Sequence, residues 1–220
     1  MKQMRYIYIM LNIFVGALLW SIINPKDIFT CFLEIIPAII GILVLAFTFR
    51  KFRFTNFTYF LILVHCIILC IGGHYTYAQV LFFEYIKEIF HQSRNNYDKV
   101  GHFAQGLVPA MIIRELFIRK MVISNKSFFN FIIISICLAI SAAYEWIEWL
   151  VSVLSGDSGD AFVGTQGYIW DTQSDLLFAP LGSIVGLILF STIQDKQLQT
   201  DSFIHLIAVI LDSILEQTPD

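Results

Sequence analysis

Six long apolar stretches follow one another along the chain, separated by shorter polar segments. Each has about 17 or more residues, which as a helix is enough to cross a hydrocarbon core of roughly 30 Å. Only helices and closed barrels satisfy their backbone hydrogen bonds in lipid, and the chain has no alternating strand pattern. The pattern therefore predicts an all-α, polytopic transmembrane bundle with about six spans. The predicted spans are Tyr6–Ile23, Ile28–Phe49, Phe57–Gly73, Val100–Ile118, Phe128–Leu154 and Leu176–Ile193.

Two further segments are expected to lie along the membrane rather than across it. In residues 79–91, which overlap the stretch "VLFFEYIKEIFHQ" (80–92), polar residues recur every three or four positions with apolar residues between them. That pattern predicts an interfacial amphipathic helix. Residues 202–216 are apolar but too short to span, and we expect them to form a C-terminal surface helix on the inner side. Without a repeat or a second domain, residues 1–220 form one membrane domain.

Positive charges predict the orientation of the bundle. Lysine and arginine concentrate before the first predicted span, after the second, and between the fourth and the fifth, whereas residues 155–174 contain neither. By the positive-inside rule, the N-terminus and the C-terminus are both cytoplasmic. Residues 74–99 and 155–174 then lie on the outer side.

Composition supports the membrane assignment and excludes other classes. Hydrophobic residues make up 57% of the chain and charged residues 14%, with a mean hydropathy of +0.72; soluble domains carry about a quarter charged residues. No basic cluster suited to nucleic acid is present. All four cysteines lie in apolar segments, so we interpret them as packing residues rather than as a disulfide or zinc framework.

Polar residues enter the fourth predicted span in the stretch "YDKVGHFAQG". Asp98, His102 and Gln105 stand at positions i, i+4 and i+7, so they share one face of a helix. Polar groups are expensive in lipid, and ionisable residues inside a span are candidates for a functional site. This face is therefore one wall of a predicted outward-facing pocket.

The fifth and sixth predicted spans carry acidic residues at the same outer depth. Glu145 and Glu148 lie in a polar stripe on the fifth span, and Asp171 and Asp175 lie one turn apart at the start of the sixth. Imidazole and carboxylate together suit zinc, manganese or iron, and a divalent metal ion would relieve the repulsion among clustered acids. The predicted metal ligands are Asp98, His102, Glu145, Glu148, Asp171 and Asp175.

Other roles for these residues stay open on the sequence alone. Asp98 and Asp171 could cap the N-termini of their helices. Lys99 could neutralise one glutamate within a purely structural network. His65, in the middle of the third span, is interpreted as a hydrogen-bonded packing residue, and Glu34 lies too near the interface to assign.

A glycine-rich loop, residues 155–174, is expected to cover the pocket. Its glycines allow tight turns and close approach to a ligand. Polar side chains around the predicted pocket are candidates for substrate binding. They are His74, Tyr75, Lys99, Gln105 and Gln166.

Three motifs resemble a known family. The stretches "YDKVGHFAQG", "YEWIEW" and "GTQGYIWDTQSDLLFAPLG" are similar to the YjdF family of bacterial inner-membrane proteins, a domain family of unknown function. The similarity runs from about His74 to Gly186. More distantly, the Asp-Lys-x-x-His pattern at Asp98–His102 resembles the VanZ family, although Asp175 stands where that family suggests Asn. The resemblance implies a multi-pass inner-membrane architecture and a polar site, but no reaction.

Three functions stay open on the sequence. In the first, a metal-dependent hydrolase or transferase acts on a lipid or lipid-linked headgroup, with His102 and Asp175 as ligands and Glu145 as general base. In the second, the same acids serve a cation- or proton-coupled transporter, which the apparently dry inner halves of the spans disfavour. The third is a non-catalytic membrane partner. Substrate, metal identity and oligomeric state are not determined by the sequence.

Overall fold

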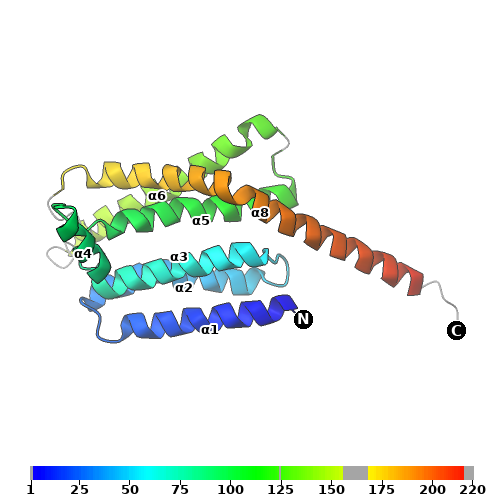
Figure 1. Cartoon of the computed structure of the whole chain (residues 1–220), viewed down its shortest axis with the longest axis horizontal. Coiled ribbons are helices and arrows are strands. Elements are labelled where there is room, and N and C mark those ends of the chain that lie inside the picture. The colour runs from blue at the N-terminus through cyan, green and yellow to red at the C-terminus, as the bar shows by residue number, and fades with distance from the viewer. Residues whose placement is uncertain (1, 124, 156–167, 216–220) are drawn as a thin grey trace.

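The computed structural model describes residues 2–123, 125–155 and 168–215 (Figure 1). These residues form seven helices and no strand, which confirms the predicted all-α fold. The helices are α1 (Lys2–Ile22), α2 (Ile28–Thr48), α3 (Asn56–Tyr75), α4 (Leu81–Ile89), α5 (Tyr97–Lys120), α6 (Lys126–Ser155) and α8 (Asp171–Leu215).

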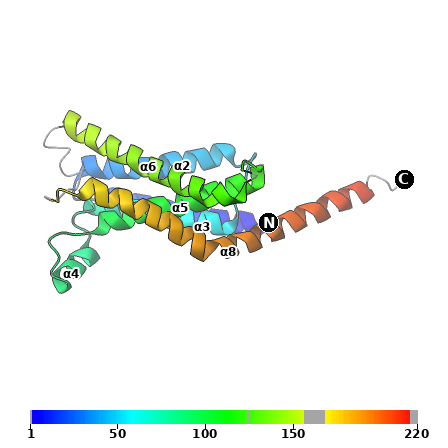
Figure 2. The same cartoon turned by 90° about the horizontal axis from the view of Figure 1, so that it is seen from above.

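Five of the described helices, α1, α2, α3, α6 and α8, are long and apolar enough to cross a membrane by length and composition. Helix α5 has a higher share of charged residues than these five, six in 24, yet it runs alongside α3, α6 and α8 within the bundle (Figures 1 and 2). Its His102 and Glu115 side chains are buried. The bundle therefore has six long helices, in agreement with about six predicted spans.

The connections between the helices divide between the two ends of the bundle. The start of α1 and the α2–α3 and α5–α6 connections lie at one end, and α4 and the start of α8 lie at the other (Figure 1). Helix α4 falls within residues 79–91, where an amphipathic helix is expected. Helix α8 differs from expectation, because it continues unbroken to Leu215 and extends beyond the bundle (Figures 1 and 2). Residues 202–215 therefore continue α8 and do not form the separate surface helix that was expected.

Helices α5 and α8 approach each other closely because two glycines lie where they cross. A Cβ atom on Gly106 would stand 1.7 Å from the carbonyl oxygen of Ala179, and one on Gly182 would stand 2.0 Å from that of Phe103. Small residues allow such backbone contact between membrane helices. The crossing places the outer ends of α5 and α8 side by side, which brings their acids together.

The ring of Tyr77 fills the space between α3 and α5. A Cβ atom on Gly72 would stand 2.0 Å from this ring, and one on Gly101 would stand 2.8 Å from it. Thr76 and Tyr77 both adopt positive φ, which ends α3 and turns the chain back toward the bundle.

The inner half of the bundle contains a buried polar network between α3, α5 and α8, which corrects the expectation that it is dry. Glu115 is fully buried, and it accepts hydrogen bonds from the Thr55 backbone N–H at 2.8 Å and from the Thr58 hydroxyl at 2.6 Å. Beside it, Arg114 donates to Gln194 Oε1 at 2.8 Å. The expectation was wrong because threonine and glutamine are uncharged and the apolar pattern hides them.

The cysteines behave as the sequence predicts. All four are free and buried, and Cys66 and Cys70 belong to the apolar core that α1, α2, α3 and α5 share. Their packing role is confirmed.

Candidate functional site

The imidazole of His102 is held in a defined orientation on α5. Its Nδ1 atom lies 3.1 Å from Gln105 Oε1, one turn along the same helix, and 3.5 Å from Ser141 Oγ on α6. With Nδ1 donating to Gln105 Oε1, Nε2 would carry the free lone pair. Such an outer hydrogen bond is how proteins orient a histidine that binds a metal.

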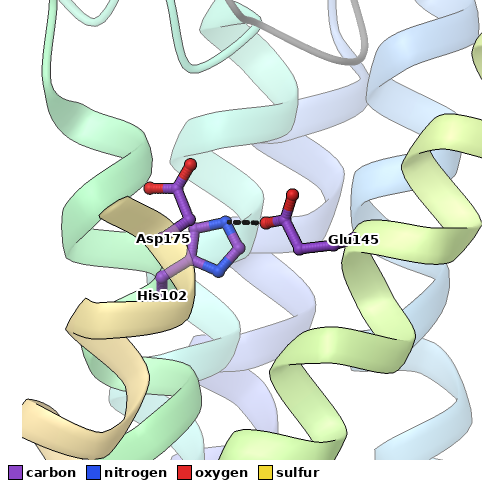
Figure 3. A group of neighbouring side chains, drawn as sticks. All are labelled: His102, Glu145 and Asp175. Carbon is purple, nitrogen blue, oxygen red and sulfur yellow. Dashed lines mark ion pairs between the residues drawn. The ribbon is translucent and has the colours of Figure 1, made fainter. Parts of the chain in front are cut away.

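The free Nε2 atom of His102 faces Glu145 Oε1 on α6 at 3.4 Å (Figure 3). Both side chains are buried, and within the described part of the chain Glu145 Oε1 has no hydrogen-bond partner. Buried polar atoms are almost always paired, because leaving one without a partner costs about 1–3 kcal/mol. The two facing atoms are both electron-rich, so a positively charged species between them would satisfy both.

Asp175 of α8 completes this group. One potential ligand atom from each of His102, Glu145 and Asp175 lies within 4.8 Å of the others. Ligands of one zinc ion stand about 2.0–2.2 Å from it, so a small inward movement would bring all three into contact with one ion. A second group, Asp98, Asp171 and Asp175, meets the same criterion. The site therefore has groups that could hold a metal ion.

Two basic residues already neutralise much of the second group. The buried guanidinium of Arg94 donates through Nη1 to Asp171 and through Nη2 to Asp98. Lys99 Nζ lies 3.4 Å from Asp175 Oδ1 and 3.7 Å from Asp171 Oδ1. Opposite charges stabilise these carboxylates in place. Lys99 thus also contacts Asp175 of the first group. Because the first group adds the facing pair His102 and Glu145, it is the better candidate for a metal.

Arg94 is a residue of the site that the sequence does not predict. It lies in the outer connection, residues 74–99. A signal was present, because Arg94 is the only arginine of that connection and stands four residues before Asp98. Charge-bearing residues at that spacing lie close together when the chain is helical.

A cavity of about 840 Å³ adjoins the site. This volume is within the range of ligand pockets, about 300–1,000 Å³. Polar residues from α2, α3, α5, α6 and α8 line it together with apolar residues. The polar lining comprises Glu34, His65, Tyr77, Asp98, His102, Gln105, Tyr144, Glu148 and Asp175.

The apolar wall of this cavity comes largely from α2 and α6. Ile40 on α2 and Ile140 and Ile147 on α6 line it, and all three are also exposed on the outside of the protein. The cavity therefore extends from the polar site to the surface that faces lipid. His65 lines it as well.

Of the other predicted residues, some lie at the site and others lie away from it. Glu148 lines the cavity but belongs to neither candidate metal group, and Gln105 contacts His102. His74 and Tyr75 do not join the site: His74 Nδ1 lies 3.1 Å from the Ser21 carbonyl, and its ring stacks on Trp20 and contacts Tyr75.

The remaining expectations concern the loop and the helix starts. Gln166 and most of residues 155–174 lie outside the described residues. Asp98 and Asp171 lie in the first turns of α5 and α8, where Arg94 joins them, but the N-cap of α5 is Asn96 and not Asp98. Glu34 is buried and accepts a hydrogen bond from the Tyr144 hydroxyl at 3.2 Å.

Comparison with known proteins agrees with this architecture. Residues 6–196 match the family model described as "Predicted membrane protein (DUF2238)". The chain belongs to this family. It is 42% identical over 182 residues to the inner membrane protein YjdF of Escherichia coli (strain K12), covering 83% of this chain and 87% of that protein.

Family membership confirms the resemblance to YjdF and the inner-membrane location. The comparisons give no support to the more distant resemblance to the VanZ family. No solved structure matches the chain. The chain is thus an integral, multi-pass inner-membrane protein of the DUF2238 family, and its chemistry has to be argued from the site.

Proposed function

We propose that this protein binds a divalent metal ion through His102, Glu145 and Asp175 and uses it for hydrolysis or group transfer on a lipid or lipid-linked headgroup. The observation that carries the proposal is the pair of buried atoms His102 Nε2 and Glu145 Oε1. They face each other at 3.4 Å, and Glu145 Oε1 has no hydrogen-bond partner among the described residues. Asp175 supplies a third ligand atom within reach.

The residues suit metal-assisted attack by water. A bound metal polarises a phosphoryl or acyl oxygen and lowers the pKa of a coordinated water. His102, Glu145 and Asp175 would hold the ion, and the second carboxylate oxygen of Glu145 would accept a proton from that water. Lys99, which lies beside Asp175, is positioned to contact an anionic oxygen of the substrate.

The cavity supports a lipid as the substrate class. Its polar end holds His102, and its apolar wall, with Ile40 and Ile147, reaches the lipid-facing surface. An amphiphile could enter between α2 and α6 with its headgroup at the site and its chain against the apolar wall.

Elemental analysis of the detergent-purified protein tests the metal. We expect near-stoichiometric zinc, manganese or iron in the wild type, and loss of it in His102→Ala and Glu145→Gln. The matched control is Glu148→Gln, which changes a carboxylate of the same helix and cavity outside the candidate groups. A wild type that stays metal-free after loading with each ion would contradict the proposal.

Reaction on lipid is tested separately. Wild-type protein in vesicles of bacterial lipids should produce a metal-dependent change in the lipid extract by mass spectrometry, and Glu145→Gln should abolish it. If the protein holds metal but no lipid changes, the site binds a metal without this chemistry.

One observation favours a second candidate, cation- or proton-coupled transport. The cavity reaches His65 on α3, and the buried network around Glu115 includes Thr58 of the same helix. Polar groups therefore lie toward both ends of the bundle. Transport predicts that Glu145→Gln and Glu115→Gln each abolish ion flux into vesicles, whereas the enzymatic proposal predicts no flux in the wild type.

A further inference from the structure

A second cavity lies in the inner half of the bundle, apart from the polar site. It measures about 320 Å³ and is formed by α1, α2 and α3. Tyr59, Ile62 and Leu63 of α3 form a buried floor, while Tyr8 on α1 and Ala46 on α2 are exposed at its edges. It is therefore a groove that opens toward lipid.

The groove has the depth of one lipid leaflet. On α1 it runs from Met4 to Phe14, ten residues apart, which corresponds to about 15 Å along a helix. A hydrocarbon core is roughly 30 Å thick, so the groove covers half of it. The part covered is the half that begins at the N-terminus of α1, on the predicted cytoplasmic side.

Basic residues surround the inner mouth of this groove. Arg5 follows Met4, Arg50 and Lys51 follow Phe49, and the Arg53 guanidinium stands 4.7 Å from the centre of the Phe49 ring. These four basic side chains are exposed. No Asp or Glu occurs between Met1 and Lys26, or between Glu34 and Glu84, so these segments contain no acid to neutralise them.

We propose that this groove binds an anionic phospholipid of the cytoplasmic leaflet. One acyl chain lies in the groove between α1 and α2, and the phosphate of the headgroup contacts Arg50, Lys51 and Arg53. A lipid fits better than a soluble anion, because the groove itself is apolar and only its mouth is charged. The proposal is independent of the metal site.

Binding is tested with the full-length protein in detergent, using phosphatidylglycerol and phosphatidylcholine of the same chain length. Phosphatidylglycerol should raise the unfolding temperature more than phosphatidylcholine, and native mass spectrometry should show one retained phosphatidylglycerol. The triple variant Arg50→Gln/Lys51→Gln/Arg53→Gln should lose roughly 100-fold in phosphatidylglycerol binding, because each of the three basic residues near an anionic lipid contributes about five-fold.

Two further variants distinguish the groove from the surface. Lys196→Gln removes an exposed charge from α8, which does not line the groove, and should leave the retained lipid in place. Ala46→Phe fills the groove and should displace it. Equal responses to both lipids, or unchanged binding in the triple variant, would overturn the proposal. So would stabilisation by glycerol phosphate alone, or a change of oligomeric state in Ala46→Phe without loss of lipid.

Discussion

Arg94 and Asp171 form a buried ion pair, although 77 residues separate them in the sequence. Their side chains are only 6% and 8% exposed. The same guanidinium reaches Asp98 in the first turn of α5. Arg94 thus joins the outer ends of α5 and α8 and balances the acids at the rim of the candidate site.

Replacing Arg94 should destabilise the protein strongly. In Arg94→Gln, two carboxylates keep their buried positions without the guanidinium, and breaking a buried pair costs about 3–5 kcal/mol. The unfolding temperature in detergent should fall accordingly. Arg5→Gln, which removes an exposed arginine, is the control and should change little.

A second variant separates charge balance from simple loss of packing. Asp171→Asn added to Arg94→Gln removes one of the unpaired carboxylates, so the double variant should recover part of the lost stability. An Arg94→Gln protein as stable as the wild type would show that the ion pair is not important.

The residues that orient His102 should control the affinity for metal. Gln105→Leu and Ser141→Ala leave all three proposed ligands in place but remove the partners of Nδ1. Loss of such partners typically weakens metal binding about 10–100-fold. Competition with a fluorescent chelator measures this directly. Ser135→Ala, an exposed position on the same helix, should match the wild type, and unchanged affinity in Gln105→Leu would argue against Nε2 as the ligand.

The glycine contact between α5 and α8 should tolerate no added methyl group. In Gly106→Ala, the new Cβ must displace the Ala179 carbonyl, and overpacking of this kind costs about 1–3 kcal/mol or more. Gly16→Ala is the matched control, because nothing lies within 4 Å of a Cβ there. That variant should be neutral or gain about 0.5–1 kcal/mol. Equal unfolding temperatures for the two variants would contradict the close crossing.

The attachment of α4 should weaken in acid. Hydrogen bonds from Asn95 and Lys87 hold the pKa of Glu84 below its ordinary value of about 4.3. A carboxylate with a lowered pKa contributes stability above the unfolded value and loses it as the pH falls through the folded value. Because Glu84 is about a third exposed, the effect should be no more than about 0.5 kcal/mol.

A spin label on Tyr85→Cys can follow α4 as the pH changes. We expect its mobility to rise below about pH 4.3. In Glu84→Gln the mobility should be higher at neutral pH and nearly independent of pH. A wild-type signal that stays constant down to pH 3 would show that Glu84 does not hold α4.

Spacing within single helices was predictable, and contacts around the bundle were not. The i, i+4 pattern puts Asp98 and His102 on one face whatever surrounds them, and the structure confirms their convergence with Asp175. His74 was expected at the same depth and lies there, but against α1. Hydropathy gives depth along a helix and not the direction in which a side chain points around it.

Two other differences have local explanations. The inner network depends on Thr55, Thr58 and Gln194, which are uncharged and therefore do not interrupt an apolar pattern. The sequence does indicate that α8 continues, because residues 194–202, "QDKQLQTDS", contain neither glycine nor proline to end a helix. A loss of apolar character was interpreted as the end of a helix, although polar residues can continue one.

Helices α5 and α8 are fastened to each other at both ends and in the middle. The outer end has Lys99 with Asp175, the crossing has Gly106 against Ala179, and the inner end has Arg114 with Gln194. A pair of helices held at three levels behaves as one stiff body. Any widening of the large cavity to admit a bulky molecule must then come from movement of α2 and α6 relative to this body, and labels on those two helices would detect it.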